Sequence, residues 1–303
     1  MKRRNKSKFI FVIVILLLCG YFGIKAHLNN AANSPLSSYT KNSVVGVVYF
    51  MQGVRSGDYL VLGESRVRIY TKGDRLLNEY RINNTERIIS AVTSDLGWDS
   101  NEEILLLTGK RGEGFGKYLI ILSYDSKSAM SSKRVKGEYT EIYRHSFAGL
   151  KPWKVQTADV DGDRKKEISL SVYKTARFHP VPAKRPFLYN WEGGGVSPKW
   201  LGSKLSRPFD DYIFADLDRD GMDELVSVEV AANREKLINT YKWKGFGFEG
   251  VGESERFQDI SNIMGMDSVK AQGAKIKARV RKSGIWKWVV FEYKNGSLRI
   301  STK

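Results

Sequence analysis

Hydrophobic and polar residues alternate along most of the chain with the two-residue period of β-strands. The clearest example is Ile168-Ser169-Leu170-Ser171-Val172, in which every second side chain is apolar. Strand-forming residues dominate from Val44 onward, and no long segment after the N-terminus keeps the 3.6-residue period of an amphipathic helix. The pattern predicts an all-β domain over residues 44–303.

The strand pattern recurs as a hairpin. Apolar strands end in an aromatic residue, and a polar or glycine-containing turn follows each of them. These aromatic residues are Tyr70, Tyr124, Trp191, Trp243 and Tyr293. Their spacing of roughly 50 to 67 residues is typical of a blade array, in which each repeat forms one small sheet. We therefore expect a β-propeller-like array of about five four-stranded blades.

The N-terminus has a different pattern, in which an uncharged apolar run from Phe9 to Ile24 follows a basic flank. The run is short for a membrane span, but Lys25 can lengthen it by snorkelling. We interpret residues 9–24 as one transmembrane helix, a signal anchor that keeps residues 1–8 in the cytoplasm. Residues 25–43 then form a polar linker to an extracytoplasmic domain. A cleaved signal peptide and a lipoprotein anchor at Cys19 are the alternatives, and both export the domain as well.

Two acidic loops each precede a predicted strand. Carboxylates fall at loop positions 1, 3, 5 and 9, a glycine permits the turn, and position 7 can offer its backbone carbonyl. Ca²⁺ takes six to eight oxygen ligands, and a tight loop turns alternate side chains inward. The flanks are strand-like and position 12 holds no glutamate, which excludes an EF-hand; an acidic surface turn is the alternative. The predicted ligands to structural calcium are Asp159, Asp161, Asp163, Lys165 and Glu167 in one loop, and Asp216, Asp218, Asp220, Met222 and Glu224 in the other.

Weaker versions of the loop occur in neighbouring repeats. Asp95, Asp99 and Glu103 keep positions 1, 5 and 9, but Gly97 stands at position 3, so this loop is a candidate degenerate metal site. No acidic residue follows Asp267 at the corresponding positions, and we expect that loop to have lost its metal. A metal loop is therefore optional in each repeat, whereas the hairpin is not.

An Asp-x-Asp-x-Asp-Gly type loop followed by a strand and an aromatic hairpin resembles the FG-GAP or VCBS repeats of integrin-alpha-like β-propellers. The resemblance covers roughly residues 44–303 and is most specific in the central repeats. It implies a propeller in which calcium is structural and partners bind to other loops. Such propellers usually have about seven blades, whereas this chain has room for about five, so a five-bladed ring and an open array are both consistent with it.

Charge adds candidate partner surfaces. The net charge is +17, which attracts polyanions, and the single cysteine excludes an internal disulfide framework. One predicted strand alternates cations with apolar residues, so that the cations share a face; we expect this strand to be outermost or solvent-facing, and Trp286 and Trp288 to be core between blades. The candidate polyanion contacts are Lys275, Lys277, Arg279 and Arg281.

Residues 173–186 form a long basic and aromatic segment, which we expect to be a loop that could bind a partner. The repeated Arg-Pro-Phe sequences at Arg185 and Arg207 are interpreted as structural connections between blades. The expected partners are the membrane, through the N-terminal helix, and a protein or an acidic envelope polymer; nucleic acid is not favoured.

The chain contains three histidines and no recognisable triad, nucleophile or phosphate-binding motif. We therefore interpret it as an exported, membrane-anchored calcium-binding scaffold for binding or adhesion rather than as an enzyme. The alternative is an envelope-associated hydrolase or lyase that acts on an acidic polysaccharide, because propeller enzymes can assemble sites from scattered loops.

Overall fold

The computed structural model describes residues 47–50, 59–71, 73–125, 138–202, 204–266, 273–294 and 296–301. These residues form twenty strands and one short 3-10 helix, η1 (Ala148–Leu150). The strands, in chain order, are β1 (Val47–Phe50), β2 (Tyr59–Leu62), β3 (Arg66–Tyr70), β4 (Leu76–Arg81), β5 (Glu86–Ser94), β6 (Glu103–Lys110), β7 (Tyr118–Asp125), β8 (Glu138–Ser146), β9 (Pro152–Ala158), β10 (Glu167–Ala176), β11 (His179–Trp191), β12 (Val196–Leu201), β13 (Phe209–Ala215), β14 (Glu224–Val230), β15 (Lys236–Trp243), β16 (Phe248–Glu253), β17 (Asp259–Met266), β18 (Lys275–Lys282), β19 (Ile285–Lys294) and β20 (Ser297–Ile300).

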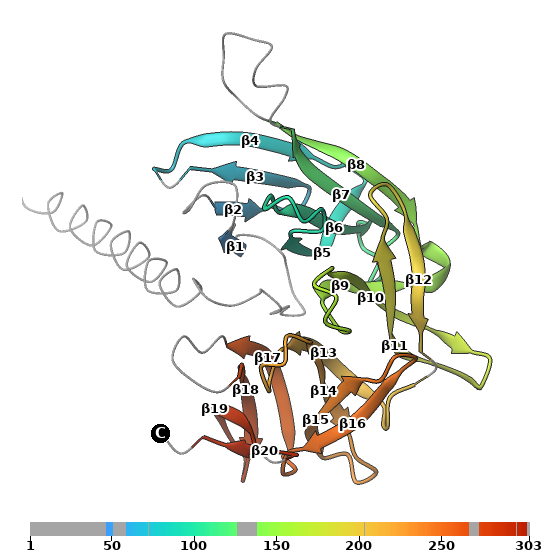
Figure 1. Ribbon diagram of the computed structural model, residues 1–303, viewed down its shortest axis with the longest axis vertical. Helices are drawn as coiled ribbons and strands as arrows, with labels where there is room; N and C mark the ends of the chain where they lie inside the picture. Colours follow the sequence, from blue (N-terminus) through green and yellow to red (C-terminus); the bar gives the residue numbers. More distant parts are fainter. Residues whose placement is uncertain are drawn as a thin grey trace, which may run out of the picture. The chain divides into compact units, whose positions relative to one another are not determined.

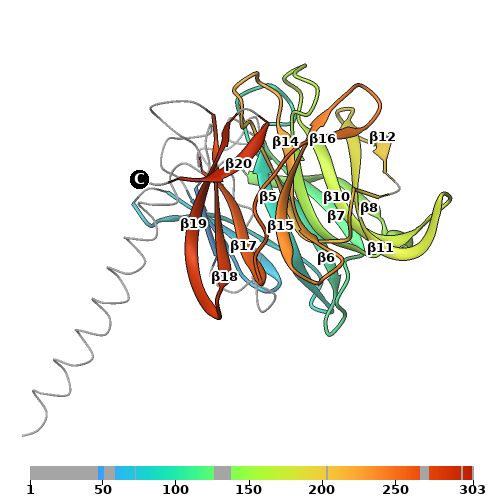
Figure 2. The ribbon, with the colours of Figure 1, turned by 90° about the horizontal axis from the view of Figure 1, so that it is seen from below.

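Each group of four consecutive strands forms one antiparallel sheet, which we number 1 to 5 in chain order (Figure 1). Neighbouring strands in a sheet are also neighbours in sequence, so every sheet is a simple meander. The first strands β5, β9, β13 and β17 of sheets 2 to 5 contact one another in turn (Figures 1 and 2). The prediction of an all-β chain with five four-stranded units is confirmed.

The core lies between sheets rather than within one of them. Four clusters of buried apolar side chains each span two successive sheets: 1 and 2, 2 and 3, 3 and 4, and 4 and 5. The second strands of sheets 2 to 4 consequently bury both faces, and residues Glu103 to Gly109 of β6 are all buried. These strands read as continuous runs of buried residues because both faces meet a neighbouring sheet.

The end sheets differ from the central ones. Strands β2 and β3 of sheet 1 and β18 of sheet 5 alternate between buried and more exposed residues, as expected for a sheet with a single packed face. None of the four core clusters joins sheet 5 to sheet 1. The described residues therefore form a row of five sheets and show no closed ring.

The segment 173–186 is not a loop. Strands β10 and β11 continue through it as a long hairpin, in which Ala176 lies opposite His179 (Figure 2). The buried guanidinium of Arg185 stabilises this hairpin by donating hydrogen bonds to the carbonyls of Lys174, His179 and Val181 at 2.9, 3.0 and 3.0 Å. The sequence prediction failed here because a long basic and aromatic segment was expected to be a loop, whereas cross-strand contacts extend the sheet.

Strand β18 lies inside sheet 5, between β17 and β19, and is exposed through one face only. The expectation that Trp286 and Trp288 are core residues is wrong, since Trp288 is 47% exposed and Trp286 is only partly buried. No helix of the described residues is long and apolar enough to cross a membrane. The run Phe9–Ile24, the linker 25–43 and the loop after Asp267 lie outside the described residues.

Candidate metal centre

The two acidic loops connect the first and second strands of sheets 3 and 4. One runs from Asp159 to Lys166 between β9 and β10, and the other from Asp216 to Asp223 between β13 and β14. Gly162 and Gly221 have φ angles of 76° and 85°, a conformation that glycine adopts without steric cost. The sharp turn that the sequence predicts is therefore present in both loops.

The aspartate at position 1 winds each loop around its own carboxylate. Asp159 Oδ1 accepts the N–H of Gly162 at 2.8 Å. Asp216 accepts the N–H groups of Arg219 and Gly221 at 2.6 and 3.2 Å. These hydrogen bonds hold each loop closed around the carboxylate at position 1.

The glutamate at position 9 closes the loop from the other end. Glu167 and Glu224 are each 2% exposed and begin the second strand of their sheet. Each accepts the N–H of loop position 2 through Oε2, from Val160 at 3.0 Å and from Leu217 at 2.8 Å. The other oxygen, Oε1, faces the aspartates of the loop.

Three of the predicted carboxylates converge in each loop. Asp159, Asp161 and Glu167 have ligand oxygens within 4.8 Å of one another, and Asp216, Asp218 and Glu224 do the same. Asp163 and Asp220 lie outside these groups and accept the N–H groups of Lys165 and Met222 at 2.8 and 2.9 Å. The structure thus brings positions 1, 3 and 9 together, and position 5 shapes the backbone at position 7.

A lysine that the sequence reasoning missed reaches each cluster. Lys199 of β12 binds Asp161 and lies 2.6 Å from Glu167 Oε1. Lys242 of β15 binds Asp220, lies 2.7 Å from Asp218 Oδ2, and is 3.5 Å from Glu224 Oε1. The sequence signal for Lys242 was its place between Tyr241 and Trp243 in the aromatic hairpin, which sets it opposite the start of β14.

One lysine does not satisfy the carboxylates of the second cluster. Glu224 Oε1 is buried and receives no hydrogen bond. Burial raises the pKa of Glu224 to about 7, and burial also raises the pKa of Asp216. Lys242 lies 3.5 Å from this oxygen, which is an ion-pair distance without a hydrogen bond. A buried carboxylate oxygen without a hydrogen bond costs free energy that a bound cation would remove. The donor set of carboxylates alone suits a hard cation such as Ca²⁺.

The loop of sheet 2 is built in the same way but does not form such a cluster. Buried Glu103 accepts the N–H of Leu96 at 2.9 Å, which repeats the position 9 contact. Its Oε1 accepts the Ser123 hydroxyl at 2.9 Å, and Asp95 accepts the N–H groups of Asp99 and Ser100. Within the described ranges, the carboxylates of Asp95, Asp99 and Glu103 are not brought together at ligand distance.

Sheet 5 carries the reverse arrangement at the same place. Lys275 begins β18, where the other second strands begin with glutamate, and Glu292 of β19 lies opposite it. Glu292 binds Lys275 and lies 2.9 Å from Lys294. Hydrogen bonds from the two lysines lower the pKa of Glu292 to about 2. At this corner of sheet 5, two lysines therefore supply the positive charge that balances the carboxylate of Glu292.

The loops are joined across the sheets. The N–H of Asp223 donates to Asp159 O at 2.6 Å, and Asp223 Oδ2 accepts the N–H of Asp159 at 2.8 Å. The N–H of Ala274 donates to Asp216 O at 2.8 Å, which links sheet 5 to the loop of sheet 4. A hollow of about 700 Å³ opens between these loops, and Trp98, Arg164 and Arg219 are among the side chains that line it.

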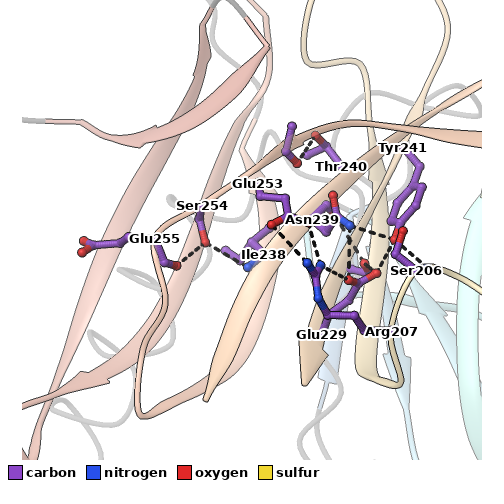
Figure 3. Close-up of polar contacts among 12 residues, drawn as sticks. Ser206, Arg207, Glu229, Ile238, Asn239, Thr240, Tyr241, Glu253, Ser254 and Glu255 are labelled. Atoms are coloured by element: carbon purple, nitrogen blue, oxygen red, sulfur yellow. Dashed lines mark hydrogen bonds and ion pairs between the residues drawn. The ribbon is translucent and has the colours of Figure 1, made fainter. Parts of the chain in front are cut away.

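A second buried carboxylate lies at the opposite end of sheet 4. Glu229 is fully buried and accepts hydrogen bonds from Asn239 at 3.2 Å and from Tyr241 (Figure 3). It also accepts a hydrogen bond from Ser227 at 3.1 Å. Arg207 bridges it to Glu253, with distances of 3.1 and 2.6 Å (Figure 3). Both oxygens of Glu229 are satisfied, and this cluster connects strands of sheet 4. Arg207 thus acts within one sheet, and Arg185 lies inside β11, so the expectation that the Arg-Pro-Phe sequences connect blades is wrong for these arginines.

Comparisons with known proteins add little. No family model matches the chain, and no curated protein matches its sequence. Among solved structures, the chain is similar to a protein of unknown function from Bacteroides caccae, with 11% identity and a TM-score of 0.39 over 80% of this chain and 76% of that chain. A similarity of this size supports neither a family nor a function.

Proposed function

We propose that this chain is an exported binding scaffold of the FG-GAP or VCBS type, anchored to the membrane by residues 9–24 and stiffened by calcium in the loops of sheets 3 and 4. The observation that carries the proposal is the buried Oε1 of Glu224, which faces Asp216 and Asp218 without a hydrogen-bond donor. Such an oxygen is a ligand without its cation. The chain is too basic for the acidic loops to be explained by general surface charge.

Structural calcium fits the way the loops join the sheets. Asp159 and Asp223 connect the loops of sheets 3 and 4, and Asp216 connects sheet 4 to sheet 5. A cation that fixes these loops also fixes the packing of three sheets. The chemistry supplied is electrostatic cross-linking of carboxylates, and the binding surfaces lie elsewhere on the sheets.

Thermal unfolding of the full chain with calcium and with EDTA tests the proposal. Calcium at 100 times its dissociation constant is expected to stabilise the fold by about 2.7 kcal/mol per site. Glu224→Gln should remove the contribution of one site, because it removes a ligand charge while keeping the size of the side chain.

Glu103→Gln is the matched control, since Glu103 has the same place and backbone contact in sheet 2 without a carboxylate cluster. It should leave the calcium-dependent shift unchanged. An equal melting temperature in calcium and EDTA, at calcium concentrations up to the millimolar range, would contradict the proposal.

A further inference from the structure

The face of sheet 5 that points away from sheet 4 carries a row of cations. Ile276, Ala278 and Val280 of β18 are buried against sheet 4, so the alternate residues of the strand lie on the other face. They follow one another at intervals of about 7 Å, twice the rise per residue of a strand. The row consists of Lys277, Arg279 and Arg281, next to the ion-paired Lys275.

These three cations have no carboxylate partner among the residues that the structure describes. Asp259, the carboxylate opposite Arg281, is bound by Lys236 of sheet 4 at 2.6 Å. Sheet 1 also carries neighbouring cations, but a carboxylate lies among them. There Arg68 and Arg81 both lie 2.5 Å from Glu79. The row of sheet 5 thus has no carboxylate among the described residues, whereas the cations at the other end of the array share the carboxylate of Glu79.

Two tryptophans of β19 support the row. Trp288 lies opposite Arg279, and Trp286 lies opposite Arg281. Lys277 Nζ is 5.2 Å from the centre of the Trp288 ring, and Arg279 is 5.2 Å from that of Trp286. Contact with an aromatic ring holds a long cationic side chain in place without cancelling its charge. The cations lie beside both rings, and inserting the tryptophans into a bilayer would bury these charges as well.

We propose that this face binds a linear phosphodiester polymer of the cell envelope, such as a polyol phosphate chain. A straight row of single positive charges matches a polymer that carries one charge in every backbone repeat. In a ribbon-like polysaccharide, successive carboxylates point to opposite sides, so only every second one would meet the row. The net charge of +17 disfavours a second copy of the chain as the occupant.

Arginine adds a reason to choose phosphate. Its planar guanidinium binds phosphate oxygens through two parallel hydrogen bonds, which a point charge cannot do. Arg279 and Arg281 are both exposed and lie in the interior of the sheet, so both can present this fork to a ligand. The inference names a partner for the scaffold proposed above and rests on that proposal, but it does not depend on the cation sites.

Fluorescence anisotropy of end-labelled poly(glycerol phosphate), titrated with the full chain in detergent, tests the inference. Three phosphate contacts predict a slope of about −2 for the logarithm of the binding constant against that of the salt concentration. Arg279→Gln with Arg281→Gln should weaken binding roughly tenfold or more and reduce the slope by about 1.4. Lys282→Gln with Lys287→Gln, at alternate positions of β18 and of the neighbouring β19, removes the same number of positive charges and should have little effect.

Four results would overturn the assignment: absence of binding, equal loss in both pairs of variants, equal or tighter binding of polygalacturonate or a single-stranded oligonucleotide, and binding to phosphatidylglycerol vesicles in preference to the polymer. Titrations in calcium and in EDTA separate this inference from the cation sites. Binding that is the same in both supports the face on sheet 5. Binding that needs calcium but not Arg279 and Arg281 would place the ligand at the loops and contradict it.

Discussion

In sheet 4 the second strand begins with a glutamate, Glu224, and a lysine, Lys242, faces it from the third strand. In sheet 5 the second strand begins with a lysine, Lys275, and a glutamate, Glu292, faces it. The backbone pairing at the two corners is the same, but the charges are exchanged. Sheet 4 adds two aspartates to its pair and forms an acidic cluster that could hold a metal ion, whereas sheet 5 adds Lys294 to its pair.

The comparison shows that the same backbone arrangement carries different charged groups in different sheets. The corner where the first hairpin turns must place a charged group at the start of the second strand in every sheet from 2 to 5. What varies is the group that contacts it: the hydroxyl of Ser123 in sheet 2, a lysine in sheets 3 and 4, and a glutamate in sheet 5. If sheets 3 and 4 bind calcium as proposed, a few side chains on an unchanged backbone set the metal dependence.

The largest expected effect on stability comes from disrupting the contact between the loop of sheet 4 and the segment that leads into β18 of sheet 5. Gly273 has a φ of 77°, and a Cβ there would lie 1.8 Å from the carbonyl oxygen of Leu217. Gly273→Ala should therefore lower the free energy of unfolding by about 3 kcal/mol or more, because neither backbone can yield cheaply. Urea denaturation measures this change.

Gly284→Ala is the matched control, since Gly284 has a φ of 79° but open space around the position of a Cβ. Its cost should be only that of the backbone conformation, about 1 kcal/mol. Equal losses of unfolding free energy in the two variants would show that this contact between sheets 4 and 5 contributes nothing to stability.

The contributions of Glu224 and Glu292 to the free energy of unfolding should depend on pH with opposite signs. Burial raises the pKa of Glu224 to about 7, so the folded state holds this proton more tightly than the unfolded chain. Without calcium, the free energy of unfolding should fall as the pH rises from about 4.5 to 7, by about 1–3 kcal/mol. The pKa of Glu292 is lowered to about 2, so its stabilisation is present above pH 4.5 and is lost as the pH falls toward 2.

Denaturation as a function of pH in EDTA, with Glu224→Gln and Glu292→Gln, separates the two contributions. Glu224→Gln should flatten the decline between pH 4.5 and 7, and Glu292→Gln should leave that decline intact. The same slope in the wild type and in Glu224→Gln would contradict the assignment of the decline to Glu224.

A smaller effect is expected when the charges of sheet 5 are exchanged. Lys275→Glu alone places two carboxylates on directly opposite residues and should lower the melting temperature by a few degrees. Adding Glu292→Lys restores an opposite-charge pair in the orientation of sheet 4 and should recover most of the loss. Calorimetry of the single and double variants measures the coupling, and a loss in the double variant equal to the sum of the single losses would contradict it.

The sequence predicted the parts of the site that are local in the chain. Short-range spacing in the sequence predicts the loops that begin at Asp159 and Asp216. It also predicts the aromatic hairpins, so both loops and all five sheets could be predicted. Lys199 and Lys242 were not found as partners of the loops, because their positions depend on strand pairing across 32 and 24 residues from Glu167 and Asp218. Trp288 was wrongly predicted to be buried, because an aromatic residue in a strand usually lies in a core between sheets. Trp288 instead lies on the face of sheet 5 that points away from sheet 4.

The row of core clusters has a consequence for cooperativity. In the core clusters of the described residues, each sheet shares its apolar contacts with the sheets next to it, so the stability of the array is close to a sum of nearest-neighbour terms. Sheets 1 and 5 each have one such neighbour, whereas sheets 2 to 4 have two. Amide hydrogens in β18 should therefore exchange with solvent faster than those in β6, β10 and β14, and unfolding should begin at the ends of the row and travel inward.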